Sequence, residues 1–269
     1  MKQILLTTAM LIATVTGALT AEITTGDLAN FPTADIVVLG EVHDNGLHHL
    51  GQAAAIVAIK PKAVVFEMLS PKQAALITPA LLADQAALAE VLDWEHSGWP
   101  DFALYYPVFA ELDGIKVFGA ARPREEVRRS FSDGAAAVFG SGADILGLDS
   151  AVPQEQLEQR MQEQFAAHCG AMPLEMMGGM VEAQRFRDAA FGAAVIEAFE
   201  ETGGPVVLIA GNGHARKDWG VPAVLAQARP DLSVLAVAHL EGPVVNLPPF
   251  DLWVVTKAAE RDDPCLAFK

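Results

Sequence analysis

Four side chains that can exchange protons or bind a metal follow runs of residues typical of buried strands. Glu41 and His43 come after the first run, in GEVHDN. Glu67 ends the second run, and His214 follows the glycines of GNG after a later one. In a parallel sheet such strand ends meet at one edge, where ligands bind. Because residues two apart in an extended chain point the same way, Glu41 and His43 can enter one pocket.

The chemistry of this cluster allows two functions. His43 and His214 can bind a divalent metal together with carboxylates, or the carboxylates and imidazoles can act as general acids and bases. In a metal-dependent hydrolase, Glu41 or Glu67 would be the general base. The spacing does not choose between these chemistries, and each residue taken alone also fits a hydrogen-bonding or capping role.

Two expected helices carry polar residues that can support the cluster. In the helix expected over 173–202, Gln184 and Asp188 share one stripe with four apolar residues: Met177, Val181, Phe191 and Val195. If this stripe packs inward, both polar groups need partners and can orient the histidines; if the helix is turned, both reach solvent. His48 and His49 are adjacent on the first helical stretch, so we expect at most one of them to bind a ligand.

The segment 93–107 concentrates aromatic side chains. Its members include two tryptophans, a phenylalanine and both tyrosines of the chain: Trp94, Trp99, Phe102, Tyr105 and Tyr106. Such density either lines a flat apolar ligand or packs a helical cap. The residue types alone favour packing.

The elements that position these residues alternate along the chain. Short β-branched runs predict strands over 35–40, 63–67, 115–119, 144–149, 205–211, 232–238 and 251–256. Stretches at helical spacing predict helices over about 47–59, 72–90, 101–113, 153–168 and 173–202. This alternation indicates an α/β fold with a mostly parallel sheet flanked by helices. The aromatic-rich stretch from about 70 to 110 is longer than a crossover needs, so we expect a helical insertion that caps the site.

The first residues of the chain have the plan of a signal peptide. Lys2 precedes an apolar stretch, and small residues lead to cleavage points after Ala18 or Ala21. We therefore expect residues 1–21 to be a leader, 22–269 to form one domain, and the mature protein to be periplasmic. An uncleaved membrane anchor is the alternative. No cysteine follows the apolar stretch, so we do not expect a lipid anchor.

The chain is strongly acidic. Its net charge is −16, and loss of Lys2 with the leader makes it more negative. Such a surface repels nucleic acid and anionic lipid. We therefore exclude nucleic-acid readers and proteins of the membrane surface.

The only two cysteines are Cys169 and Cys265. In an oxidising compartment we expect them to form a disulfide that ties the C-terminal segment to the domain. Two buried free thiols are the alternative. A cysteine-based metal site is disfavoured because the chain has no CxxC spacing.

Several short motifs occur together and in a fixed order. They are GEVHDNGLHH, the GWP segment with its tyrosines, HCG followed by AQRFRD, GNGHARKDWGVP and a closing DPC. In this combination the chain resembles the ChaN-like haem-binding family, which belongs to a superfamily with erythromycin-esterase-like and TIKI/TraB-like proteins. The likeness covers nearly the whole expected mature chain.

The resemblance implies a haem-binding role at the bacterial envelope, with haem at a dimer interface and its iron ligated by a tyrosine. Tyr105 is then the first choice for the ligand of haem iron and Tyr106 its competitor, because a phenolate suits ferric iron. His48, His49, Gln184 and Asp188 would belong to the cofactor site. The resemblance also implies partners: haem, a second copy of the chain, and outer-membrane or periplasmic components of haem uptake.

Two departures from the family pattern limit this transfer. Many relatives carry a lipobox cysteine, which this chain lacks, and an asparagine expected in AARPR (120–124) is missing. Three functions therefore remain open: a periplasmic haem-binding protein in haem or iron handling, a metal-dependent hydrolase using the Glu/His cluster, and a structural protein with a vestigial site.

Overall fold

The computed structural model describes residues 20–30, 32–263 and 265–266. Within these ranges seven strands form one sheet: β1 (Ala21–Ile23), β2 (Ile36–Glu41), β3 (Ala63–Phe66), β4 (Lys116–Gly119), β5 (Val206–Gly211), β6 (Val234–Glu241) and β7 (Leu252–Thr256). Their order is β1-β7-β6-β2-β5-β3-β4, and neighbouring strands run parallel. The predicted α/β class with a parallel sheet is confirmed.

Both faces of the sheet are covered by apolar side chains, as parallel sheets require. Along β2, Val37 and Leu39 point into one core layer, while Ile36 and Val38 point into the other. Every residue of β2 is buried. The continuous apolar run that predicted this strand therefore results from burial on two sides.

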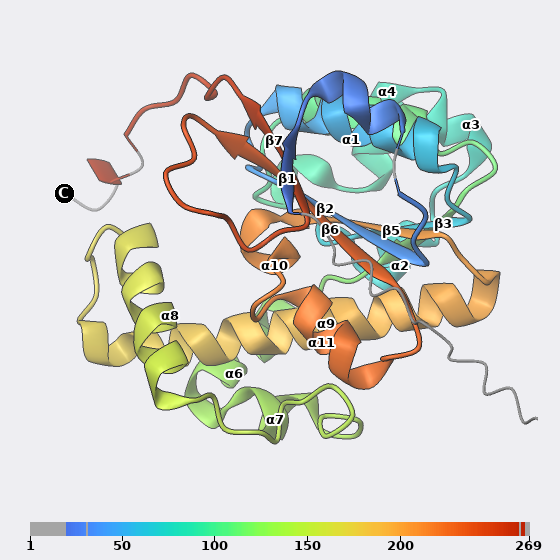
Figure 1. Ribbon diagram of the computed structural model, residues 1–269. Coiled ribbons are helices and arrows are strands. Elements are labelled where there is room, and N and C mark those ends of the chain that lie inside the picture. The colour runs from blue at the N-terminus through green and yellow to red at the C-terminus, as the bar shows by residue number, and fades with distance from the viewer. Residues whose placement is uncertain (1–19, 31, 264, 267–269) are drawn as a thin grey trace, which may run out of the picture.

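The first layer of helices contains the expected insertion (Figure 1). Its members are α1 (Gly46–Ile59), α2 (Pro71–Ala74), α3 (Pro79–Leu82), α4 (Gln85–Val91), the short η2 (Trp94–His96) and α5 (Phe102–Ala110). The helix predicted over 72–90 is divided into three, because Thr78 and Asp84 cap new helices and Pro79 begins one. The side chains of Trp94, Phe102 and Tyr105 are buried in this layer. The aromatic segment is thus packed core, as its residue types indicated.

The second layer is organised on α9 (Met177–Thr202), the long helix that runs below the sheet in Figure 1. Packed on or near it are α6 (Arg124–Asp133), α7 (Ala135–Phe139), α8 (Gln154–Ala167) and α11 (Val221–Ala228), with the short α10 (Asn212–Ala215) after β5. Two short 3-10 helices, η1 (Thr25–Ala29) and η3 (Leu174–Met176), complete the described helices.

Two expectations about the elements need correction. The strand predicted over 144–149 is absent, since this segment consists of turns. Leu146 and Leu148 are buried, but they pack beside Phe186 of α9 in a separate core layer, where no strand edge is available. Helices α6, α7 and α11 were not among the predicted stretches.

The two ends of the chain bear on the leader and on the disulfide. Ala21 opens β1 and donates its N–H to Asp251 O over 3.0 Å, so cleavage after Ala18 would leave β1 whole, whereas cleavage after Ala21 would shorten it. Residues 1–19 of the expected leader lie outside the described residues. Cys169 and Cys265 form the expected disulfide. The alternatives, two free thiols or a cysteine metal site, are therefore wrong.

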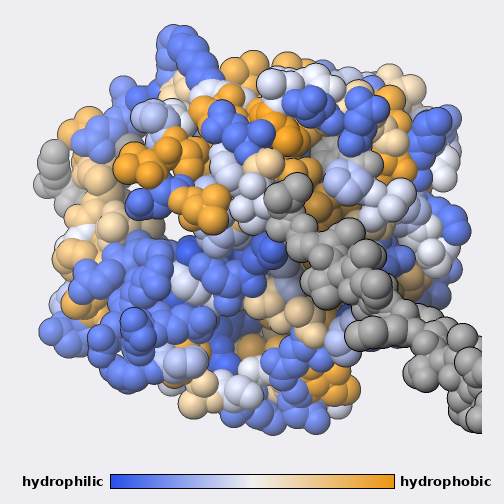
Figure 2. Space-filling model, viewed as in Figure 1, coloured by the Kyte–Doolittle hydropathy of each residue, from blue (hydrophilic) through white to orange (hydrophobic). Residues whose placement is uncertain are grey.

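The described part of the chain has no helix with the length and apolarity needed to cross a membrane. Figure 2 shows that its surface is not uniform in this view. Hydrophilic residues dominate over α8, while hydrophobic residues gather over the segment between β6 and β7, where Val245 and Leu247 are exposed.

Candidate functional site

The strand ends bring the predicted cluster together. Glu41 ends β2 opposite Gly211, the last residue of β5, and β3, which leads into Glu67, pairs with the other side of β5. Gly211 leads into α10, which carries His214. A Cβ at Gly211 would lie 2.9 Å from two atoms of the His43 ring. Glycine is therefore required for the close approach of His43 to this strand end.

Glu41 is the centre of a buried set of hydrogen bonds. His43 Nδ1 donates to Glu41 Oε1 over 2.8 Å, and Tyr105 OH donates to the same oxygen over 3.0 Å. Gln52 Nε2 donates to Glu41 Oε2 over 2.8 Å, and His49 Nε2 lies 3.4 Å from that oxygen. Both carboxylate oxygens are thus occupied, by groups from α1, α5 and the loop that follows β2.

These contacts shift the pKa values of Glu41 and His43. Burial alone would raise the pKa of Glu41, but the hydrogen bond from His43 and the approach of His49 hold it well below its usual value. Burial alone would lower the pKa of His43, but the bond to Glu41 and the negative charges of Glu67 and Glu41 raise it. The pair therefore favours an ionised carboxylate beside an imidazole that protonates readily.

Glu67 forms the second centre. Its Oε1 pairs with Arg187 of α9, and its Oε2 accepts the N–H of Gly211 over 2.7 Å. His214 Nε2 lies 3.5 Å from Oε1. Burial would raise the pKa of Glu67, but the positive charges of His214, Arg187 and His43 keep it below its usual value. Glu67 is therefore held ionised between two imidazoles and a guanidinium.

The polar stripe of α9 faces this cluster. His214 Nδ1 donates to Asp188 Oδ1 over 2.6 Å, and the side-chain amide of Gln184 lies 2.9 Å from the same nitrogen. Burial raises the pKa of Asp188 against the opposing charge of His214. The inward orientation of the stripe, one of the two open at the sequence level, is thus the one observed.

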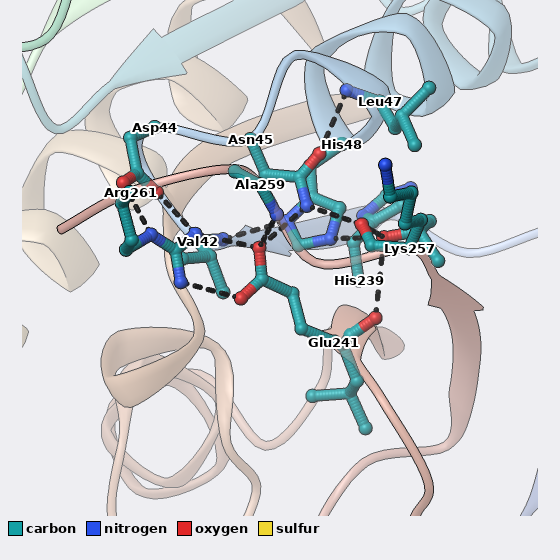
Figure 3. A network of polar contacts seen from close by, with 12 residues as sticks. Val42, Asp44, Asn45, Leu47, His48, His239, Glu241, Lys257, Ala259 and Arg261 are labelled. Carbon is teal, nitrogen blue, oxygen red and sulfur yellow. Dashed lines mark hydrogen bonds and ion pairs between the residues drawn. The ribbon is translucent and has the colours of Figure 1, made fainter. Parts of the chain in front are cut away.

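His48 belongs to a different network, which Figure 3 shows. Its Nδ1 accepts the N–H of Val42 over 2.9 Å, so its Nε2 carries the proton and donates to Thr256 Oγ1 over 2.9 Å. Asn45 caps α1 by accepting the N–H of Leu47 over 3.0 Å. His48 and His49 thus point to different places, as expected, and His48 does not join the Glu41 cluster.

The same network ties the GEVHDN loop to the last part of the chain. Asn45 Nδ2 donates to Glu241 Oε1 over 2.6 Å and to Lys257 O over 3.0 Å. Arg261 donates to both carboxylates of Asp44 and Glu241, over 2.6 to 2.7 Å (Figure 3). This part of the motif is therefore structural.

We expect His48 to make stability depend on pH. Burial and the nearby charge of His239 lower the pKa of His48 from 6.5 to about 4, so the folded state prefers the neutral ring. Stability linked to His48 is complete above about pH 6.5 and falls as the pH decreases to about 4, by up to about 3 kcal/mol. Urea unfolding at several pH values should show a smaller loss for His48→Gln than for wild type. If the free energy of unfolding falls equally with pH in His48→Gln and in wild type, this assignment is contradicted. His96→Gln, a change at an exposed histidine, is the control.

The metal hypothesis gains no support from the geometry. Among the described residues, no three His, Cys, Asp or Glu side chains are arranged to hold a metal ion. His43 and His214 are each paired through Nδ1 with a carboxylate of their own, Glu41 and Asp188. Two imidazole–carboxylate pairs around Glu67 suit proton exchange better than a shared metal. The catalytic roles themselves stay predictions.

The hydroxyl groups of the two tyrosines bond to different partners. Tyr105 is fully buried, and burial followed by the negative charge of Glu41 raises the pKa of its phenol far above the usual value. Tyr106 OH donates to Leu82 O over 3.1 Å. Iron ligation by Tyr105 would require its bond to Glu41 to break and the phenol to lose its proton. That role stays a prediction, and these contacts do not favour it.

A cleft that the sequence pattern did not reveal opens beside the cluster. It has a volume of about 500 Å³, and its wall includes Glu67, Trp99 and four arginines: Arg122, Arg124, Arg128 and Arg187. These are four of the ten arginines of a chain whose net charge is −16. The sequence feature that could have indicated this cleft is the group of four arginines over 122–129, which is unusual in so acidic a chain.

A second pocket of about 470 Å³ adjoins this cleft between α6, α8 and α9. The two share Val127, Arg128 and Arg187 as lining residues. The second pocket adds apolar walls from Phe131 and Met180. We call the two together the arginine cleft. It combines arginine side chains with apolar surface, which suits a flat apolar anion.

Comparison with known proteins identifies the family. The chain matches the family model described as haem-binding uptake, Tiki superfamily, ChaN, over residues 28–225, well over half of its length. The chain belongs to this family. The matched range includes Glu41, Glu67 and His214. No curated protein shows significant sequence similarity to the chain.

Three solved structures are similar to the chain over most of its length. ChaN of Campylobacter jejuni, described by its cofacial haem binding, is 17% identical with a TM-score of 0.59, over 85% of this chain and 89% of that one. The type III effector HopBA1 is 15% identical with a TM-score of 0.45, over 87% and 92%. The erythromycin esterase EreC is 14% identical with a TM-score of 0.41, over 77% and 70%. At these identities the first likeness shows the fold alone.

Proposed function

We propose that the protein binds haem in the periplasm and takes part in haem or iron uptake. Membership of a family described as haem-binding carries this proposal. The signal-peptide plan of residues 1–21 supports the location. The hydrolase alternative stays a prediction from the Glu/His cluster, and no geometry favours it over haem binding.

Within the chain, the arginine cleft fits haem best. Haem is a flat apolar macrocycle with two propionates, so its site needs apolar walls and a cationic rim. Phe131 and Met180 supply apolar surface, while Arg128 and Arg187 lie where the two pockets meet. Arg187 already pairs with Glu67, whereas Arg128 has no ion-pair partner among the residues that the structure describes. Arginine is suited to carboxylates because its guanidinium can donate two parallel hydrogen bonds.

We also propose a homodimer as the haem-loaded state. Cofacial binding, reported for ChaN of Campylobacter jejuni, places haems face to face, which two clefts from two copies can achieve. Haem-uptake components of the outer membrane or periplasm would then deliver or receive the haem. Light scattering of protein with and without hemin is the measurement for the dimer.

A hemin titration tests the function and its place together. We expect purified protein to give a shifted Soret band, and Arg128→Glu to weaken hemin affinity about tenfold or more, because a charge-assisted hydrogen bond contributes about 1.5–3 kcal/mol. Arg129→Glu is the matched control, since Arg129 is the next residue on α6, pairs with Asp133 and does not line the cleft. An unshifted Soret band in wild type would refute haem binding. Equal affinities of the two variants would refute the arginine cleft as its place.

A further inference from the structure

We infer that the protein binds a free amino acid with an apolar side chain in a pocket between Arg160 and Asp188. This pocket has a volume of about 200 Å³ and is enclosed by the turns over 146–153, by α8 and α9, and by the start of α11. We call it the Arg160 pocket. It shares no lining residue with the arginine cleft, so the inference does not rest on haem binding.

Arg160 provides the first observation. It extends from α8, lines the pocket, and only 5% of the residue is exposed. Its Nη2 has no hydrogen-bond partner, and its guanidinium forms no ion pair, among the residues that the structure describes. A buried positive charge without an acceptor is costly. A carboxylate that enters this pocket would therefore gain a strong partner.

The acceptors around Arg160 are used by two other arginines. Arg185 pairs with an acid of its own helix and donates to three backbone carbonyls in the turns over 147–150. Arg216 pairs with two acids and places its guanidinium carbon 3.5 Å from the centre of the Trp219 ring. Of these three arginines, Arg160 is the one that lacks a polar partner within the described part of the chain.

Asp188 provides the second observation, because it brings the opposite charge to the same pocket. It is 1% exposed. Its Oδ1 accepts the hydrogen bond from His214 over 2.6 Å, whereas its Oδ2 has no partner among the described residues. Burial lowers the pKa of Arg160 and raises the pKa of Asp188, so each charge gains from a further counter-charge. Arg160 and Asp188 can each bind one end of a ligand.

These two groups favour a ligand that carries both charges. A simple carboxylate would pair with Arg160 but meet the charge of Asp188, and a simple amine would have the opposite conflict. An α-amino acid offers its carboxylate to the guanidinium and its ammonium to Asp188. Leu146, Leu148 and Val224 add apolar walls for its side chain. A volume of about 200 Å³ equals that of about seven water molecules in the liquid, which suits a small amino acid.

Calorimetric titration with glycine, L-alanine and L-valine tests the pocket. We expect the affinity to rise with the size of the apolar side chain. Isovalerate and isobutylamine, which are L-valine without its ammonium and without its carboxylate, should bind at least about tenfold more weakly, because each leaves one buried group unpaired.

Variants of the purified protein show where the amino acid binds. Arg160→Met should weaken L-valine binding about tenfold or more. Arg129→Met is the matched control, because Arg129 is exposed on α6 and does not line the pocket. Without an amino acid, Arg160→Met should unfold at a urea concentration equal to or above that of wild type, since it removes a buried charge that lacks a partner.

Four results would each overturn the inference. The first is that none of the three amino acids binds wild type, which would mean that the pocket holds water alone. The second is that isovalerate or isobutylamine binds as tightly as L-valine. The third is that Arg160→Met keeps the wild-type affinity. The fourth is that Arg160→Met unfolds far below Arg129→Met, which would show that Arg160 has a partner within the protein. None of these measurements uses hemin, so they decide this site separately from the proposed function.

Discussion

Replacing Glu41 with leucine is expected to lower the free energy of unfolding by about 3–5 kcal/mol, because it removes the shared partner of a buried charged cluster. Glu41 accepts hydrogen bonds from His43, Gln52 and Tyr105, and His49 lies beside it. Without the carboxylate these groups remain buried with no acceptor. Urea denaturation at neutral pH measures the loss.

Two further variants show whether the effect comes from the lost acceptor. Glu41→Gln keeps one oxygen acceptor in nearly the same volume, so it should lose less stability than Glu41→Leu. Glu90→Leu changes an exposed glutamate of α4 and should leave the unfolding midpoint close to wild type. If Glu41→Leu also keeps the wild-type midpoint, the cluster does not stabilise the fold in the way described.

Breaking the disulfide should lower the free energy of unfolding by about as much as Glu41→Leu does. Cys169 and Cys265 are 96 positions apart, and a loop of about that length corresponds to about 4–5 kcal/mol on the chain-entropy model. The double variant Cys169→Ser/Cys265→Ser should therefore unfold at a markedly lower urea concentration than the oxidised wild type. The same decrease should follow when wild type is reduced.

A reductant provides the control for this measurement. It should lower the midpoint of wild type and leave that of the double serine variant unchanged. A wild-type midpoint that is insensitive to full reduction, verified by thiol titration, would show that the bond contributes little to stability.

The sequence predicts most of the sheet because its strands are buried on both faces. The run over 35–40 matches β2 (Ile36–Glu41) almost residue for residue, since a short continuous apolar run is typical of a strand covered on two sides. The segment 144–149 has the same appearance and forms no strand. Leu146 and Leu148 bury their apolar side chains against α9 instead. Local composition cannot report which neighbour a segment will have.

The sequence likewise predicts one part of the candidate site and misses another. Strand ends located Glu41, Glu67 and His214 correctly at one edge, because a parallel sheet brings its carboxyl ends together. The burial of Tyr105 under Glu41 depends on how α5 packs on α1, which no motif encodes. The arginine cleft depends on the packing of α6 and α8 on α9, and α6 was not predicted at all.

The contacts of Arg261 have a consequence for the order in which the molecule is completed. Arg261 reaches Asp44 across a separation of 217 positions, and Asn45 reaches Lys257 across 212. Contacts between such distant parts of a chain form slowly, because the intervening chain must first be ordered. During synthesis the GEVHDN motif is therefore made early, but its loop reaches the shape seen here only after the segment that contains Lys257 and Arg261 has been made.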